Sequence, residues 1–264
     1  MNATKRPVRL GVIGTGMMGC EHIRNIVALE GAEVAAISDP HEPSIEWARI
    51  ALDGRGSPRV HADHRELLDA GGLDGVIVAS PNHTHVDVLR DVLASDVHCL
   101  VEKPLCTNVA DCIEVAERAA SRPALTWVGL EYRYMAPVNA LLDVVRSGSL
   151  GPLKMMFIRE HRFPFLVKVG NWNRFTRNTG GTLVEKCCHF FDLMNLAVGS
   201  QPRRVYASGG QDVNHLDETY DGERSDILDN AFVIVDYANG VRASLELCMF
   251  AEASQYEQEI VVVG

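Results

Sequence analysis

The sequence predicts a two-domain α/β protein, in which a doubly wound parallel sheet is followed by an α+β domain with a mostly antiparallel sheet. Strand and helix signals alternate through the first half of the 264 residues, and such alternation is typical of parallel sheets. A glycine-rich turn closes the first predicted strand, and from about Leu153 the strands become longer. We therefore place the domains at residues 1–130 and 131–264.

In the first domain, the expected strands are 8–13, 33–38, 59–62, 75–79, 97–101 and 125–130, and the expected helices are 19–29, 43–52, 64–70, 84–95 and 108–121. The runs 75–79 and 97–101 are short and continuously apolar, as expected for strands buried on both faces. Their carboxyl ends should lie at a ligand-binding edge, because open parallel sheets bind ligands there.

In the second domain, strands are expected at 153–163, 203–210, 231–237, 241–248 and 256–263, with one helix at 182–198. Asn239 and Gly240 between two of these strands predict a hairpin turn. The polar segment 212–229 is expected to be a surface loop whose acidic side chains are solvated.

The first predicted strand leads into the pattern G-x-G-x-x-G at Gly14, Gly16 and Gly19. In dinucleotide-binding proteins the first glycine permits a tight turn, the second lets the backbone approach the pyrophosphate, and the third lets the helix pack close to its strand. The helix N-terminus then offers N–H groups to the anion. We expect this turn, including Met17 and Met18, to bind a dinucleotide; a glycine turn without a phosphate is the alternative.

Asp39 lies where the second predicted strand ends, 20 residues after Gly19. An acid at this position accepts hydrogen bonds from the ribose hydroxyls and repels a 2′-phosphate. The residues that follow, Pro40-His41-Glu42, include no arginine that could neutralise such a phosphate. The sequence therefore predicts NAD rather than NADP as the cofactor.

Two further segments follow predicted strands at the ligand-binding edge, and their residues expected to contact the cofactor are Ser80, Pro81, Asn82, His85, Glu102 and Lys103. Pro104 restricts Lys103 to an extended conformation and makes a cis bond possible. A partly desolvated lysine at this place suits proton transfer or carbonyl polarisation. A surface lysine after a strand fits the local sequence equally well.

The segment 180–192 contains a second group of candidate residues. A glycine pair opens the predicted helix, and Glu185 and His189 share one helix face because they are spaced i, i+4. A histidine whose tautomer is fixed by a carboxylate is a standard general base. A helix cap followed by a core histidine is the alternative interpretation, and Asp192 is expected to be structural.

Composition excludes several classes of partner. The formal net charge of −10 argues against nucleic acid or an anionic membrane, because both require a basic surface. No apolar run has the length of a membrane span and no signal-peptide pattern opens the chain, so we expect a cytoplasmic protein.

The seven cysteines form no CxxC pair and are expected to be reduced thiols. Neighbouring Cys187, Cys188 and His189 point in different directions on a helix, so no metal site is expected.

Together, four motifs resemble the glucose-fructose oxidoreductase/inositol dehydrogenase/MocA family: the glycine turn, Ser80-Pro-Asn-His-Thr-His85, Glu102-Lys-Pro104, and Gly180-Gly-x-Leu-x-Glu-x-x-x-His-x-x-Asp192. The resemblance covers nearly the whole chain. It implies an enzyme that transfers a hydride between a sugar or cyclitol and NAD, with Lys103 and His189 as catalytic residues.

The resemblance also implies residue roles. His189 would take the proton of a secondary alcohol while the carbon-bound hydride passes to the nicotinamide, and Lys103 would hydrogen-bond the same oxygen. Glu185 would orient His189 or bind a neighbouring hydroxyl. A polyol pocket, or alternatively ordinary packing, is expected from Tyr132, Arg133, His161, Trp172, Asn173 and Arg174.

Two features depart from the family pattern. The helix acid is commonly aspartate, whereas this chain has Glu185 followed by Lys186. Family members usually continue beyond the equivalent of Gly264, so the second domain is expected to be truncated or unusually small. The last predicted strand, 256–263, would then present an unpaired edge, and we expect a homodimer or homotetramer.

Two other functions use the same residues. One is a redox-neutral NAD-dependent lyase or glycosidase, in which the sugar is oxidised transiently and the hydride returns. The other is a non-catalytic regulator that senses the dinucleotide. The intact Lys103 and His189 argue against the regulator, because a sensor needs no proton relay.

Overall fold

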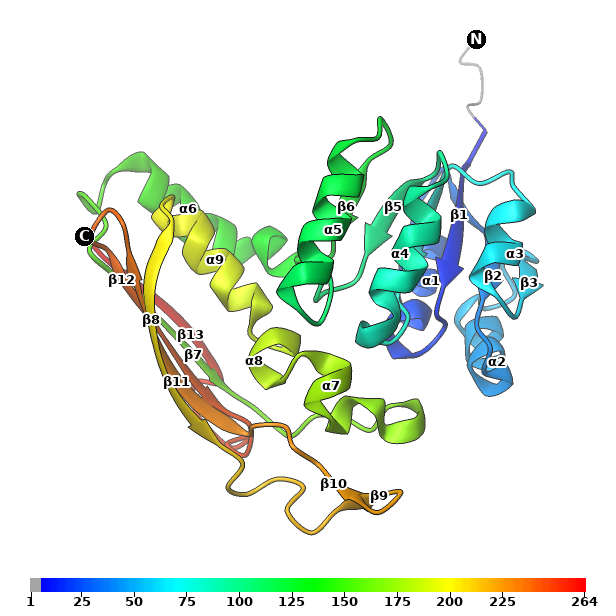
Figure 1. Cartoon of the computed structure of the whole chain (residues 1–264). Helices are drawn as coiled ribbons and strands as arrows, with labels where there is room; N and C mark the ends of the chain where they lie inside the picture. Colours follow the sequence, from blue (N-terminus) through cyan, green and yellow to red (C-terminus); the bar gives the residue numbers. More distant parts are fainter. Residues whose placement is uncertain (1–5) are drawn as a thin grey trace. The chain divides into compact units, whose positions relative to one another are not determined.

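A computed structural model describes residues 6–264 of the chain (Figure 1). Two compact units follow one another along the chain, the first ending at Gly129 and the second beginning at Leu130. Within the described residues no helix is long and apolar enough to cross a membrane.

The first unit is a six-stranded parallel sheet with the order β3-β2-β1-β4-β5-β6. The strands are β1 (Val8–Ile13), β2 (Ala32–Ser38), β3 (Arg59–His61), β4 (Gly75–Val78), β5 (His98–Val101) and β6 (Thr126–Val128). The helices are α1 (Met17–Ala28), α2 (Glu42–Ala51), α3 (His64–Asp69), α4 (His85–Leu93) and α5 (Val109–Ala120), with a 3-10 turn η1 (Asn82–Thr84). The predicted doubly wound parallel sheet is confirmed.

Helices cover both faces of this sheet, because its strands are apolar on both sides. Ile23 of α1 and Ile45 of α2 pack on one face, whereas Leu67 of α3 and Leu89 of α4 pack on the other. The strand order reverses between β1 and β4, which pair in parallel. The carboxyl ends of these two strands therefore form the switch point at which open α/β sheets bind ligands.

The second unit is a five-stranded sheet with helices on one face. Its strands are β7 (Met155–His161), β8 (Pro202–Gly210), β11 (Asn230–Tyr237), β12 (Arg242–Cys248) and β13 (Gln258–Val263), with a separate two-stranded pair of β9 (Thr219–Tyr220) and β10 (Glu223–Arg224). The helices are α6 (Ala136–Ser147), α7 (Thr176–Thr179), α8 (Thr182–Glu185) and α9 (Cys188–Val198), with 3-10 segments η2 (Glu131–Tyr134) and η3 (Val169–Arg174).

The sheet order is β13-β7-β12-β11-β8. All neighbours are antiparallel except β7 and β12, which are parallel. The expected hairpin joins β11 to β12, and Gly240 has φ +87° in its turn. The mostly antiparallel sheet is thus confirmed, and β13 lies at its edge.

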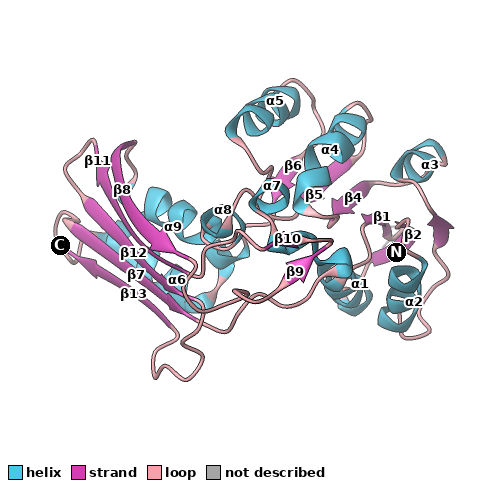
Figure 2. Ribbon diagram, turned by 60° about the horizontal axis from the view of Figure 1, so that its bottom comes forward, coloured by secondary structure: helices cyan, strands magenta, loops and turns pink. Residues whose placement is uncertain are grey.

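Side chains alternate across this sheet. Ile158, Leu245 and Val233 face the helices and form the core with Phe190 and Met194 of α9. Figures 1 and 2 both show α6 and α9 on one face of the sheet, while no helix of the described chain covers the other face. One face of the sheet is therefore buried and the other is open.

Two expectations for the second unit were wrong. The single helix expected at 182–198 is interrupted at Lys186 and Cys187, so Glu185 ends α8 and His189 lies in the first turn of α9. The segment 212–229 is not a solvated loop throughout. Asp229 is only 2% exposed, and its carboxylate accepts the backbone N–H groups of Asp212, Val213 and Asn214.

Candidate functional site

The glycine turn after β1 is shaped by close backbone contacts. A Cβ on Gly14, whose φ is +88°, would lie 2.5 Å from the backbone nitrogen of Ser80, and a Cβ on Gly19 would lie 2.0 Å from the carbonyl oxygen of Gly14. A Cβ on Gly16 would meet no protein atom within 4 Å. Gly14 and Gly19 are thus required by the protein's own packing, whereas the space beside Gly16 is open.

The open side of the turn suits an anion. Gly16 is the N-cap of α1 and supplies no side-chain oxygen to the first turn of the helix. Met17 and Met18, which follow it, are exposed. Backbone N–H groups at a helix N-terminus attract phosphate, so the turn has the shape and polarity that a pyrophosphate requires.

Asp39 lies at the end of β2, as expected. Its Oδ2 accepts a hydrogen bond from the backbone of Thr15 at 2.7 Å, and its Oδ1 accepts one from the backbone of His41 at 2.8 Å. The Thr15 hydroxyl lies 3.3 Å from Oδ2. A carboxylate has about four acceptor positions, so these bonds fix Asp39 and leave capacity for a ribose hydroxyl.

His85 differs from its expected role. The side chain is fully buried, with Nδ1 2.9 Å from the carbonyl oxygen of Pro104 and Nε2 3.0 Å from that of Ser80. Burial lowers the pKa of His85, although its contacts with the backbone carbonyls oppose this. A buried ring cannot contact a cofactor directly. His85 instead links the segment after β4 to the segment after β5.

The other residues of the first segment lie near the surface to different degrees. Ser80 and Pro81 are half-buried, whereas Asn82 is buried in η1. The Thr84 hydroxyl donates to the carbonyl of Pro81 and lies 2.8 Å from the Ser80 hydroxyl, from which it can accept. These bonds fix the turn, so Ser80 and Pro81 are the members of this segment best placed for a ligand.

Glu102 and Lys103 are held at the end of β5 by a contact that the sequence did not reveal. His22 of α1 lies with Nε2 2.8 Å from Oε1 of Glu102, and the other oxygen of Glu102 accepts the backbone N–H of Lys103 at 3.1 Å. Burial opposes ionisation of Glu102, but the hydrogen bond and charge of His22 and the charge of Lys103 hold its pKa below the usual range. The Lys103–Pro104 bond is cis.

These features fit a dinucleotide. The open space at Gly16, the helix N-terminus, the fixed carboxylate of Asp39 and the anchored Glu102-Lys103 segment all lie on the carboxyl side of the parallel strands. NAD would be held by this edge of the first unit.

In the second unit, two glycines with positive φ lead into the histidine helix. Gly180 has φ +78° and ends α7, and Gly181 has φ +90° and begins α8. Both values favour glycine, because side chains with a Cβ rarely adopt them. The glycine pair thus turns the chain sharply between two short helices, just before Glu185 and His189.

His189 is buried and lies among polar groups. Its ring stacks on Tyr132 with a centroid distance of 4.3 Å and an interplanar angle of 9°, and its Nε2 lies 3.5 Å from Oε1 of Glu131. Glu185 is also buried. A histidine fixed in this way has one defined orientation, which a proton-transfer group requires.

Sequence reasoning noted Lys186 but missed its role in a buried polar cluster. Its Nζ lies 2.9 Å from Oε1 of Glu160 and 2.9 Å from the hydroxyl of Tyr132. Burial opposes the charge on Lys186, but Glu160 and Tyr132 raise its pKa above the usual value. No local signal in the sequence pairs Lys186 with Glu160, because Glu160 comes from a different element, β7.

Arg133 and Asp192 form an ion pair, in which the guanidinium Nε donates to Oδ2 of Asp192 at 2.6 Å. This contact ties η2 to α9, in agreement with the structural role expected for Asp192. Arg133 remains partly exposed, and Trp172 of η3 is also half-buried.

Three residues expected to line a polyol pocket are placed elsewhere. His161 lies on the open face of the sheet, opposite to Glu160, and its ring nitrogens contact Glu246 at 2.8 Å and Ser254 at 3.0 Å. Asn173 is fully buried, and its amide donates to the carbonyl of Leu166. His161 could not be placed from the sequence because Glu246 lies 85 residues away, whereas Asn173 bonds to Leu166, only seven residues away, and its burial has no local signal.

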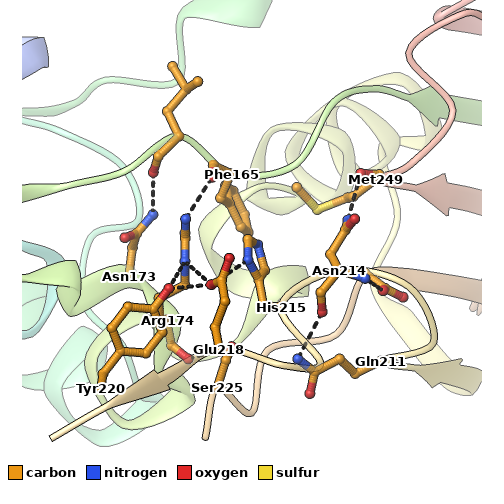
Figure 3. A network of polar contacts seen from close by, with 12 residues as sticks. Phe165, Asn173, Arg174, Gln211, Asn214, His215, Glu218, Tyr220, Ser225 and Met249 are labelled. Atoms are coloured by element: carbon orange, nitrogen blue, oxygen red, sulfur yellow. Dashed lines mark hydrogen bonds and ion pairs between the residues drawn. The ribbon is translucent and has the colours of Figure 1, made fainter.

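Arg174 is the third of these residues and is the buried member of a network of polar contacts (Figure 3). Its side chain, only 3% exposed, contacts the Tyr220 hydroxyl at 3.2 Å, the carbonyl of Phe165 at 3.1 Å and Glu218 at 3.5 Å. His215 also contacts Glu218, at 2.8 Å. Arg174 therefore holds the segment around β9 against η3 and is structural.

The fold and the cofactor edge define the class of protein: one with an NAD-binding parallel-sheet domain followed by an α+β domain. The family model described as "Oxidoreductase family, NAD-binding Rossmann fold" matches residues 8–130. The model described as "Oxidoreductase family, C-terminal alpha/beta domain" matches residues 143–264. The chain therefore belongs to the glucose-fructose oxidoreductase/inositol dehydrogenase/MocA family and binds NAD.

Known relatives agree with this assignment. The rhizopine catabolism protein MocA of Rhizobium meliloti is 30% identical over 200 residues, which cover 74% of this chain and 58% of that protein. The myo-inositol 2-dehydrogenase of Thermotoga maritima is 27% identical over 259 residues, which cover 97% of this chain and 73% of the relative. The chain thus matches little more than half of MocA and about three quarters of the second relative.

A solved structure supports the fold. The myo-inositol dehydrogenase of Lactobacillus casei, crystallised with NAD(H) and myo-inositol, superposes with a TM-score of 0.81 at 23% identity. The superposition covers 98% of this chain and 72% of that protein. At this identity the comparison shows a shared fold.

Proposed function

We propose that the chain is an NAD-dependent dehydrogenase that oxidises a secondary alcohol of a sugar or cyclitol. The observation that carries the proposal is the setting of His189, a buried imidazole fixed by the Tyr132 stack and close to the carboxylate of Glu131. The names of the relatives support the substrate class, because several are inositol 2-dehydrogenases.

Each residue has a role in this proposal. When bound, NAD supplies the acceptor for the hydride that leaves the alcohol carbon. His189 removes the hydroxyl proton, and its fixed ring plane keeps the accepting nitrogen in one direction. Lys103 donates a hydrogen bond to the reacting oxygen, and Glu185 orients His189 or binds a neighbouring hydroxyl. These are the roles that general acid–base chemistry requires.

For substrate binding we propose Tyr132, Arg133 and Trp172, which are all partly exposed. Aromatic rings can cover the C–H groups of a polyol, and a guanidinium can donate to its hydroxyls. His161, Asn173 and Arg174 are not included, because the first lies on the open sheet face and the other two are buried in structural contacts.

The test is a panel of cyclitols and sugars incubated with the protein and NAD⁺ while NADH absorbance is followed. We expect oxidation of at least one cyclitol or pyranose, and no comparable activity with simple primary alcohols. A panel without NADH formation at high protein concentration would refute the proposal. Retention of NAD through purification without net NADH formation would support the redox-neutral alternative.

We further propose that the open face of the five-stranded sheet mediates self-association. Phe232, Ile234 and Tyr206 lie on this face with exposed fractions of 65%, 45% and 50%. Contiguous exposed apolar groups of this kind mark interaction surfaces. Light scattering should show a dimer or tetramer that dissociates when Phe232 and Ile234 are changed to Ser. A wild-type monomer at micromolar concentration would contradict this.

A further inference from the structure

Lys186 is a buried charge in contact with Tyr132, the residue that stacks on the histidine of the proposed reaction. The side chain of Lys186 is 12% exposed and that of its partner Glu160 is 4% exposed. A buried ion pair is costly to form and gives little net stability. A pair in this position therefore calls for an explanation other than fold stability.

Tyr132 connects the pair to His189. Its hydroxyl oxygen lies 2.9 Å from Nζ of Lys186 and 2.9 Å from the amide nitrogen of Gln258. Its ring stacks on the His189 imidazole, and a T-shaped contact with Phe190 supports it from another side at 5.6 Å. The phenol is thus fixed at its hydroxyl end by two donors and at its ring by two aromatic contacts.

We propose that Lys186 is a positioning residue that acts through Tyr132 to fix the plane of the His189 imidazole. Glu160 holds the ammonium group of Lys186 in place, Lys186 holds the hydroxyl of Tyr132, and the Tyr132 ring holds His189. The contacts come from three elements, β7, α9 and η2, and from the residue that follows α8. This inference rests on the proposed role of His189 as the base.

The physical reason is the directionality of proton transfer. A base must present its accepting nitrogen within hydrogen-bond distance of the substrate hydroxyl, and a misplacement of about 1 Å can cost about 100-fold in rate. An imidazole in the first turn of a helix can still rotate about its side-chain torsions. A parallel stack at 4.3 Å restricts that rotation.

Several titratable groups face this cluster. Glu131 lies 3.5 Å from His189, Glu185 is buried four residues before it, and Nζ of Lys186 lies 5.3 Å from the centroid of the Tyr132 ring. Changes at Lys186 can thus alter both the orientation of His189 and its local charge. The experiment must separate these two effects.

The first measurement uses NMR of the histidine ring protons and needs no turnover. In the wild type, the His189 signal, assigned by its loss in His189→Gln, should be shifted upfield by the stacked Tyr132 ring. The variant Lys186→Met/Glu160→Gln removes both charges and so leaves no unpaired buried charge. In this variant we expect the chemical shift of His189 to move, at every pH, toward the shifts of histidines that are not stacked on a ring. An unchanged signal would overturn the inference.

The second measurement is a double-mutant cycle between Lys186 and Tyr132. Lys186→Met should lower kcat by about 10- to 100-fold with little change in the KM for NAD, because NAD binds to the first unit. In the background of Tyr132→Phe, the same change should alter kcat by no more than about twofold. If the fold-decreases in kcat of the two single variants multiply in the double variant, the residues act independently, and Lys186 does not act through Tyr132.

Lys154→Met is the matched control, since it removes the same charge from an exposed position. It should leave both the NMR signal and kcat unchanged, and an equal loss in this control would overturn the assignment. Should the wild type oxidise no member of the substrate panel, the proposed function fails. The NMR measurement would still decide whether Lys186 fixes His189.

Discussion

The two units hold their proposed functional groups in different ways. In the first unit the backbone determines the geometry: Gly14 and Gly19 permit close contacts, and backbone N–H groups fix Asp39 and Glu102. In the second unit side chains determine it. His189 is oriented by a ring stack, and the stacking tyrosine is held by a buried ion pair.

Cofactor binding and proton transfer therefore depend on different kinds of structure. A site built from backbone is rigid and suits the constant shape of a dinucleotide. A site built from side chains can change by substitution at single positions. Variants of the glycine turn and of Asp39 should therefore affect cofactor binding, whereas variants of His189 and of the side chains that orient it should affect turnover.

The largest expected effect concerns the two proposed proton-transfer residues. Lys103→Met and His189→Gln should each reduce kcat by about 100- to 10,000-fold, because general acid–base groups contribute this much. NAD affinity, measured by calorimetry, should change little in either variant. Turnover within about threefold of wild type in both variants would show that the relay is assigned wrongly.

The glycine turn offers a matched pair of variants with different outcomes. Gly19→Ala forces a Cβ to within 2.0 Å of a backbone oxygen, so it should lower the free energy of unfolding by about 1–3 kcal/mol or more and weaken NAD binding. Gly16→Ala meets no protein atom and should weaken NAD binding without destabilising the fold. Thermal unfolding and calorimetry test both. Equal losses of stability would contradict the account of the turn.

These two predictions show which parts of the molecule could be predicted from the sequence. The parallel sheet, the glycine turn and Asp39 could be predicted because they depend on short-range patterns and backbone geometry. The positions of His161 and Arg174 could not, because Arg174 contacts Tyr220, 46 residues away, and His161 contacts Glu246, 85 residues away. The break in the helix before His189 was also missed, because neither Lys186 nor Cys187 is a glycine or a proline.

Cofactor preference gives the third prediction. Asp39 is fixed by Thr15 and His41 and cannot turn away easily from a 2′-phosphate. Like charges in contact cost several kcal/mol, so kcat/KM should favour NAD⁺ over NADP⁺ by about 100-fold or more. Asp39→Ser should reduce this preference. Higher kcat/KM with NADP⁺ in the wild type would refute the role of Asp39.

The smallest expected effect concerns Asp229 in the second unit. Burial opposes ionisation of Asp229, but the backbone N–H groups of Asn214, Val213 and Asp212 together hold its pKa below the usual value. A lowered folded-state pKa stabilises the protein above the unfolded pKa of about 3.9, and the stabilisation is lost as the pH falls through the folded value. Asp229→Asn should therefore cost about 1–3 kcal/mol at pH 7 and flatten the acid side of the stability curve. An unchanged curve would contradict this.

The central claim, net hydride transfer from a polyol to NAD, can be tested most directly with an isotope. The protein is incubated with NAD⁺ and myo-inositol or glucose that carries deuterium on every carbon, and the cofactor is analysed by mass spectrometry. The account predicts one deuterium in each NADH formed, together with an equal amount of ketone or lactone, and a rate of label transfer about 100- to 10,000-fold lower with His189→Gln. Absence of labelled NADH with every substrate, or return of the deuterium to a rearranged sugar, would contradict the account.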